Sequence, residues 1–228
     1  MRHLDDTSTR ILQTAGPFFA KNGFQGTTVR EICSQAKVNL SAINYHFGDK
    51  ESLYIATIQL AHQSRTEKYP LPEWDEKTPT ATKLRGFITT LILRMVGVGE
   101  DDRWQTELIF REVTQPTAAC ESLVADYFRP NMNCLLEILG EVLPAETPQH
   151  QRLQTAFSIV GQCLFYRTTA HTISMMVSPE EQQQHYRTEQ LANHITTLTL
   201  ASLGMSDTIQ TQTSEPNESQ QNVSRNLT

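Results

Sequence analysis

Aromatic residues and glycine are scarce in this sequence. Phe, Trp and Tyr make up 7% of the 228 residues, and there are only 10 glycines. A β-sandwich is rich in aromatic strand residues and tight turns, so this composition argues against one. Stretches rich in Ala, Leu, Gln and Glu instead repeat their apolar positions at helical spacing. The sequence therefore predicts an all-α protein.

The sequence has no apolar run of the roughly 18 residues that a membrane-spanning helix needs. Its first ten residues contain no apolar stretch after their charges, so no secretory signal is predicted. We therefore expect a cytoplasmic protein without a membrane partner. The four cysteines follow no CxxC or Cys/His spacing, and their apolar surroundings favour reduced, buried thiols; they are Cys33, Cys120, Cys134 and Cys163.

Motifs of common catalytic and metal sites are missing as well. The seven His residues form no HExxH pair and no Ser-His-Asp context, and there is no glycine-rich phosphate loop. We predict that the chain is not an enzyme and that it needs no cofactor or metal.

An overall excess of positive charge, which favours phosphate binding, is also lacking, because the net charge is -6. The average hides an asymmetry. Residues 1–50 hold six basic and four acidic side chains, a surplus of two, so the remainder carries -8. A mildly basic N-terminal module can thus approach nucleic acid while an acidic body stays away from it.

The first helix is predicted from about Thr7 to Asn22, where apolar residues share one face. Gly23 is expected to end it. Pro17 lies within this range and has no N–H to donate, so we expect a kink or a restart of the helix there.

Three more helices follow at short intervals. Thr28 and Glu31 have the spacing of a capping box, which opens a short second helix. The turn KVN at 37–39 leads into a third helix over 40–47, which Asn39 can cap. Gly48 ends it, and Asp49 caps a fourth, longer helix. Two short helices joined by a three-residue turn form a helix-turn-helix, whose second helix normally enters the major groove.

The third helix is patterned for base reading. Leu40, Ile43 and Phe47 are expected to face the other helices. The opposite face combines small and hydrogen-bonding side chains without a charged residue, and it consists of Ser41, Ala42, Asn44, Tyr45 and His46. For His46, a phosphate contact or a helix-packing role explains the residue better than catalysis does.

Three stretches together resemble the N-terminal domain of TetR/AcrR-type regulators: GTTVREI at 26–32, KVN at 37–39 and NYHFGDKESL at 44–53. The resemblance implies that Thr28 and Lys50 hold phosphates. It also implies that Tyr45 and His46 brace the helix on the DNA backbone and that Ser41, Ala42 and Asn44 read bases. The DNA-binding candidates are Thr28, Arg30, Leu40, Ser41, Ala42, Asn44, Tyr45, His46 and Lys50.

The sequence departs from the family pattern at three positions. Lys37 replaces the usual turn glycine, Leu40 replaces a frequent lysine, and Pro17 interrupts the first helix. These departures affect the turn geometry and the base preference, since Leu40 can at most touch a thymine methyl.

Two long helices are predicted at the end of the fold, over about 148–177 and 179–203. In the resembled family the last two long helices pair across a two-fold axis, which implies a homodimer on a palindromic operator. Leu191, Ile195, Leu198 and Leu200 offer apolar surface for this pairing, and simple intrachain core is the alternative.

We expect four parts: an N-terminal arm over 1–6, a helix-turn-helix DNA-binding domain over 7–64 with its motif at 28–47, a helical regulatory and dimerisation domain over 65–204, and a disordered tail over 205–228.

The resemblance further implies a small-molecule effector among the central helices. The candidate ligand contacts are Trp104, Glu107, Phe110, Arg111, Tyr127, Phe128, Phe165 and Tyr166, with ordinary core as the alternative. Further residues that could orient a polar ligand, or could simply lie at the surface, are Gln105, Arg167 and His171. The segment 107–116 is similar to CecR-like members of the family. The predicted function is a repressor released by its ligand, and the alternative is a DNA-bound structural or cell-division factor without an inducer.

Overall fold

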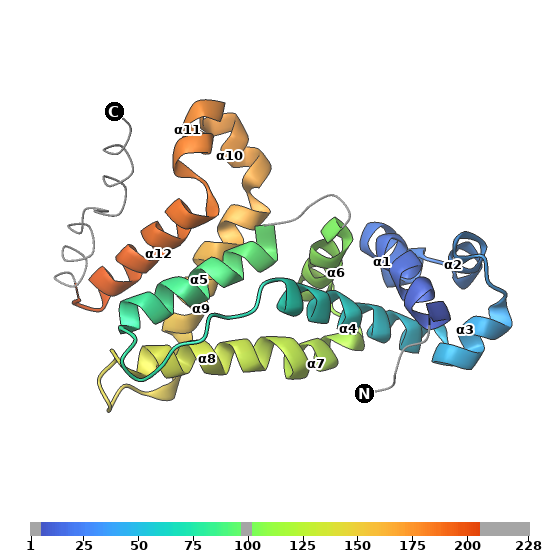
Figure 1. Ribbon diagram of the computed structural model, residues 1–228, viewed down its shortest axis with the longest axis horizontal. Coiled ribbons are helices and arrows are strands. Elements are labelled where there is room, and N and C mark those ends of the chain that lie inside the picture. The colour runs from blue at the N-terminus through green and yellow to red at the C-terminus, as the bar shows by residue number, and fades with distance from the viewer. Residues whose placement is uncertain (1–5, 97–101, 206–228) are drawn as a thin grey trace, which may run out of the picture.

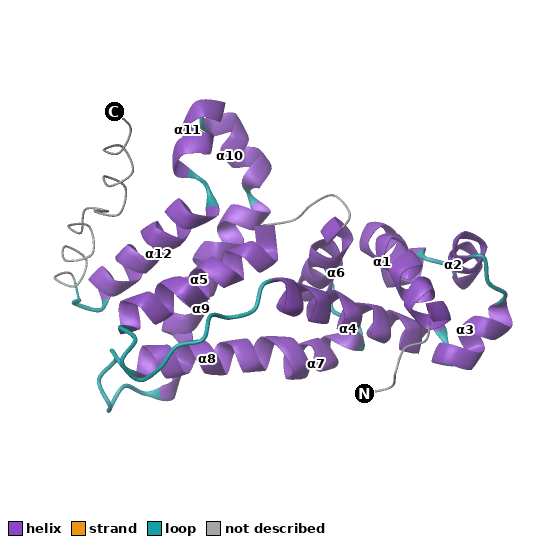
Figure 2. Cartoon of the chain, viewed as in Figure 1, coloured by secondary structure: helices purple, strands orange, loops and turns teal. Residues whose placement is uncertain are grey.

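The computed structural model describes residues 6–96 and 102–205, and all their regular elements are helical (Figures 1 and 2). The all-α expectation is confirmed. The helices are α1 (Asp6–Gly26), α2 (Val29–Ala36), α3 (Leu40–Phe47), α4 (Lys50–Lys68), α5 (Thr80–Val96), α6 (Arg103–Thr114), α7 (Ala119–Leu123), the π-helical turn η2 (Val124–Phe128), α8 (Arg129–Gly140), α9 (Gln149–Thr168), α10 (Ala170–Met176), α11 (Pro179–His185) and α12 (Thr188–Ser202). Within these residues, no helix is both long and apolar enough to cross a membrane.

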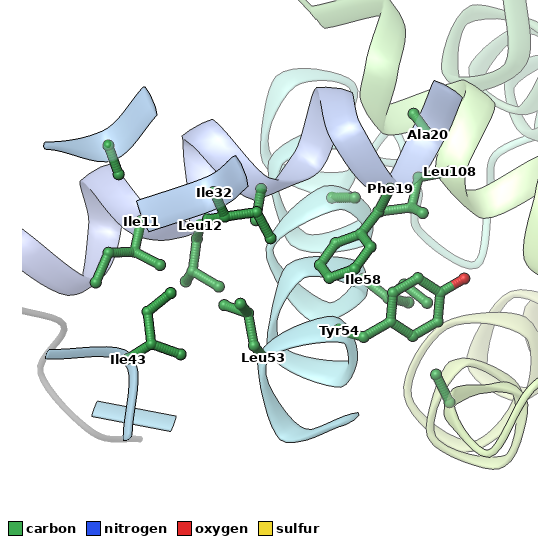
Figure 3. Packing of buried hydrophobic residues seen from close by; sticks show 14 of the residues in the cluster. Ile11, Leu12, Phe19, Ala20, Ile32, Ile43, Leu53, Tyr54, Ile58 and Leu108 are labelled. Atoms are coloured by element: carbon green, nitrogen blue, oxygen red, sulfur yellow. The ribbon is translucent and has the colours of Figure 1, made fainter. Parts of the chain in front are cut away.

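The first four helices form a small unit, here called the head, in which α2 and α3 lie at one end of the molecule (Figure 1). Its apolar centre includes Ile11, Phe19, Ile43 and Tyr54, which converge from α1, α3 and α4 (Figure 3). Leu108 of α6 belongs to the same cluster, as do residues of α7 and η2. The head therefore shares one core with α6, α7 and η2, which belong to the remainder of the chain, here called the body.

A second apolar core holds the other end of the body together. It is built from α5, α8, α9 and α12, and its fully buried members include Leu84, Ile88, Leu135 and Ile195. Leu191 and Leu200 are also buried in it, whereas Leu198 is 51% exposed. Intrachain packing thus accounts for three of the four residues considered for a dimer contact.

Helix α1 is longer and less interrupted than expected. It keeps helical backbone angles through Pro17 and departs from them only at Gly23, with φ 73° and ψ 178°, before a last turn ends at Gly26. The helix does not restart at Pro17, and it tolerates the proline because both Pro17 and Gln13, whose carbonyl loses its donor, are exposed to water.

The prediction of two long closing helices is wrong, because the structure divides each of them into two helices. The first ends at Thr168, where the Thr169 hydroxyl donates to the Phe165 carbonyl at 2.6 Å and competes with the helical hydrogen bonds. The second is split by extended backbone at Arg187, which separates α11 from α12. Residues 1–5 of the expected arm and 206–228 of the expected tail lie outside the described residues.

Candidate DNA-binding interface

A capping box starts α2, as its spacing predicted. The Glu31 amide donates to the Thr28 hydroxyl at 3.3 Å, while Glu31 Oε2 accepts from the Thr28 amide at 2.9 Å and from its hydroxyl at 2.7 Å. These hydrogen bonds from Thr28 lower the pKa of the Glu31 carboxyl. The hydroxyl proton of Thr28 is thus already engaged, so a phosphate at this helix start must draw it away from Glu31.

The turn between α2 and α3 keeps its shape without a glycine. Lys37 adopts the left-handed conformation, with φ 54° and ψ 47°, and its amide donates to the carbonyls of Cys33 and Ser34. Asn39 then caps α3 by accepting from the Ala42 amide at 2.9 Å. A left-handed lysine costs backbone free energy, which these turn hydrogen bonds offset.

Helix α3 is anchored by Ile43, which is 1% exposed in the head core. On its outer side Tyr45 is 85% exposed, and Ser41 and Asn44 are exposed as well. The Tyr45 ring stands edge-on to the ring of the half-buried His46, 5.0 Å between centroids. An exposed aromatic group next to an amide and a small hydroxyl offers both stacking and hydrogen bonds to a ligand outside the chain.

Leu40 does not face the core as expected, because it is 52% exposed. It is the first residue of α3, and helical side chains lean toward the N-terminus, so it projects beyond the core that Ile43 fills. Ala42 and Phe47 are half-buried.

The start of α4 adds a cation to the same end of the head. Asp49 caps the helix by accepting from the Ser52 amide at 2.7 Å, which lowers the pKa of the Asp49 carboxyl. The Lys50 ammonium lies 4.6 Å from the centre of the Phe24 ring. Arg30 is exposed on α2. All nine predicted DNA contacts therefore lie on α2, α3 or the immediate starts of α2 and α4.

Polar contacts join the head to α6. The Arg111 guanidinium donates to the carbonyls of Ala20 at 3.1 Å and Lys21 at 3.0 Å, just before the irregular turn at Gly23. The buried Glu112 accepts from the Tyr54 hydroxyl of α4 at 2.8 Å and from the Thr117 amide at 2.6 Å. Burial and the hydrogen bond to Glu112 raise the pKa of the Tyr54 hydroxyl. The sequence did not predict that Glu112 binds Tyr54, since no local motif indicates a partner 58 positions away.

The eight predicted ligand contacts do not line one pocket. Glu107, Phe110 and Arg111 line a pocket of about 400 Å³ between α1, α6 and the end of α9. Trp104 packs beneath Gly16 of α1, where an added Cβ would lie 2.4 Å from its ring. The other four stand in aromatic contacts elsewhere: Tyr127 with Phe128 and His62, and Phe165 with Tyr166.

Comparison with known families matches both parts of the chain. Residues 11–57 match the profile described as bacterial regulatory proteins of the tetR family. Residues 81–204 match the C-terminal domain of the HTH-type transcriptional dual regulator CecR. These matched proteins are transcriptional regulators and not enzymes, which confirms that expectation.

Individual proteins show the same likeness. The chain is 26% identical over 177 residues to the dual regulator CecR of Shigella flexneri, covering 74% of this chain and 79% of that protein. It is 38% identical over 60 residues to the transcriptional repressor NicS of Pseudomonas putida, covering 26% and 28%. The crystal structure of AibR with isovaleryl coenzyme A and operator DNA shares the fold, with a TM-score of 0.61 at 16% identity, covering 85% and 97%.

Proposed function

Because this chain belongs to the TetR family of bacterial transcriptional regulators and carries a CecR-type C-terminal domain, we propose that it is a homodimeric repressor, which leaves a palindromic operator when a small molecule binds. DNA binding and regulation follow from the family. The repressor role is supported by similarity to NicS, whose name describes a repressor. The effector is supported by the shared fold with AibR, whose structure contains both isovaleryl coenzyme A and operator DNA.

The observation that carries the DNA-binding mode is the outward face of α3. We place α3 in the major groove, where Ser41, Ala42 and Asn44 contact base edges. Tyr45, with 85% of its surface exposed, then contacts the DNA backbone together with His46. The remaining phosphate contacts come from Thr28, Arg30 and Lys50 at the starts of α2 and α4.

An exposed apolar stripe on α9 supports the dimer. Phe157 is 59% exposed and Phe165 is 54% exposed, with the exposed Gly161 midway between them at intervals of four residues. Leu198 of α12 is a further exposed apolar residue. A second copy related by a two-fold axis would cover these side chains and hold two heads at a fixed spacing, as a palindrome requires.

Selection of bound sequences from random DNA tests the proposal. The expected product is a short palindrome bound by the dimer, and Asn44→Ala should change the preference at one base pair of each half-site by about 1–3 kcal/mol. Asn133→Ala on α8, also an exposed asparagine, is the matched control and should leave the selected motif unchanged.

Genome-wide footprinting distinguishes the alternative. A repressor occupies one or a few palindromes and leaves them when a screened small molecule binds. Many dispersed sites with no release by any screened molecule would instead support a DNA-bound structural factor and would contradict the proposal.

A further inference from the structure

The pocket of about 400 Å³ beside the head has a strongly basic lining. Lys21 comes from the end of α1, Arg111 and Phe110 from α6, and Arg167 from the end of α9. Glu107 is the acidic residue of the lining, and it also approaches Arg103 at 3.6 Å. Three cationic side chains against one carboxylate favour a negatively charged occupant.

The two arginines have no carboxylate partner within residues 6–96 and 102–205. Among the residues that the structure describes, Arg111 donates only to neutral oxygens, namely the carbonyls of Ala20 and Lys21 and the amide oxygen of Gln115 at 3.2 Å. Arg167 forms no hydrogen bond with these residues, although its Nε is buried. A buried guanidinium N–H without an acceptor is costly, so an oxygen from a ligand would stabilise it.

The apolar part of the pocket comes from one aromatic ring. The Arg167 guanidinium carbon lies over the Phe110 ring, 6.0 Å from its centre, so a cation and an apolar surface adjoin in the pocket. A flat aromatic group can lie against Phe110 while its acidic group reaches Arg167. The volume lies within the range of about 300–1,000 Å³ that is typical of small-molecule sites.

We propose that this pocket binds a small aromatic carboxylic acid, whose carboxylate is held by Arg167 and Arg111 and whose ring packs on Phe110. The planar guanidinium matches a carboxylate through paired hydrogen bonds. This inference rests on the proposed function, because it identifies the chemical class of the effector. The ligand connects α9, which carries the proposed dimer face, to α6 and to the carbonyl end of α1 in the head.

Binding of 2-naphthoate to the full-length protein without DNA tests the site, measured by calorimetry and by saturation-transfer NMR. We expect Arg167→Gln to weaken binding by about tenfold to 100-fold, the loss of a charged hydrogen bond. Arg85→Gln, an exposed arginine on α5, is the matched control and should bind like the wild type. Because Arg167 makes no hydrogen bond to the described residues, its replacement should preserve the fold, which circular dichroism checks.

Two further probes define the chemical class. The neutral amide 2-naphthamide should bind at least tenfold more weakly than 2-naphthoate. Equal binding of the amide, unchanged binding by the Arg167 variant, or binding of inorganic phosphate in preference to 2-naphthoate would each overturn the assignment.

Operator affinity with and without 2-naphthoate separates this inference from the proposed function. Specific DNA binding without detectable 2-naphthoate binding would overturn the pocket assignment and leave the regulator intact. Arg167-dependent binding of 2-naphthoate to a protein that selects no operator would support the pocket and overturn the repressor.

Discussion

Replacement of Gly23 by alanine should destabilise the protein and loosen the head. Gly23 adopts φ 73° and ψ 178°, a region that residues with a side chain rarely enter, at a cost of about 1–3 kcal/mol. The new Cβ would also lie 3.2 Å from Nη1 of Arg111 and disturb its hydrogen bond to the amide oxygen of Gln115, worth about 1 kcal/mol. Alanine also reduces the conformational entropy of the unfolded chain, which offsets about 0.4–1 kcal/mol of the lost stability. The net loss is about 2 kcal/mol.

Urea unfolding at a fixed protein concentration measures this difference, and calorimetry should show a midpoint lowered by about 4–8 °C. Gly26→Ala, three residues further along, is the matched control. Its Cβ would meet only the Cβ of Asn22, at 3.4 Å, and the glycine has no positive φ. If Gly23→Ala unfolds within about 0.5 kcal/mol of the wild type, then the irregular turn does not depend on glycine and the reasoning is refuted.

Three other substitutions address the proposed dimer face, a buried contact and a helix cap. Phe165→Asp should shift the protein to monomers in analytical ultracentrifugation, because a charge replaces an apolar contact; an unchanged dimer would place the interface elsewhere. Glu112→Gln should lower the free energy of unfolding by about 1–3 kcal/mol, since one amide oxygen cannot replace both carboxylate acceptors, and an unchanged urea midpoint would contradict this. The Asp49 carboxyl has a pKa below its ordinary 3.8, so its stabilisation is present above that value and is lost as the pH falls through the lower, folded pKa. Asp49→Asn should therefore retain the cap at pH 7 and reduce the loss of stability on acidification; an acid limb identical to that of the wild type would count against this role.

The head was largely predictable because its signals are local. Thr28, Asn39 and Asp49 each cap a helix through an amide three residues further on, so the residue types and their spacing are sufficient. The left-handed turn at Lys37 could not be deduced from propensity, since glycine is the usual residue there.

Contacts between distant segments were not predictable from the sequence. Arg111 was considered as a ligand contact, yet its hydrogen bonds to the end of α1 join positions about 90 residues apart. Leu191 and Leu200 have the spacing of an interface and of a core alike, and only the packing of α12 on α5 decides for the core. Periodicity identifies an apolar face but not its partner.

Two of the polar contacts between α6 and the head differ in how easily they can open. Separation of Tyr54 from Glu112 would leave a buried carboxylate short of a donor, which is costly. Separation of Arg111 from Ala20 and Lys21 costs less, because the Lys21 side is exposed and water can replace the donors. Loss of a hydrogen bond to a charged group such as Arg111 costs about 1–3 kcal/mol. This is the usual size of the coupling free energy between an effector site and a second site. A ligand bound as proposed, which draws Arg111 toward Arg167, would therefore free the carbonyls of Ala20 and Lys21, whereas Trp104 and Leu108 would keep α6 packed against α1.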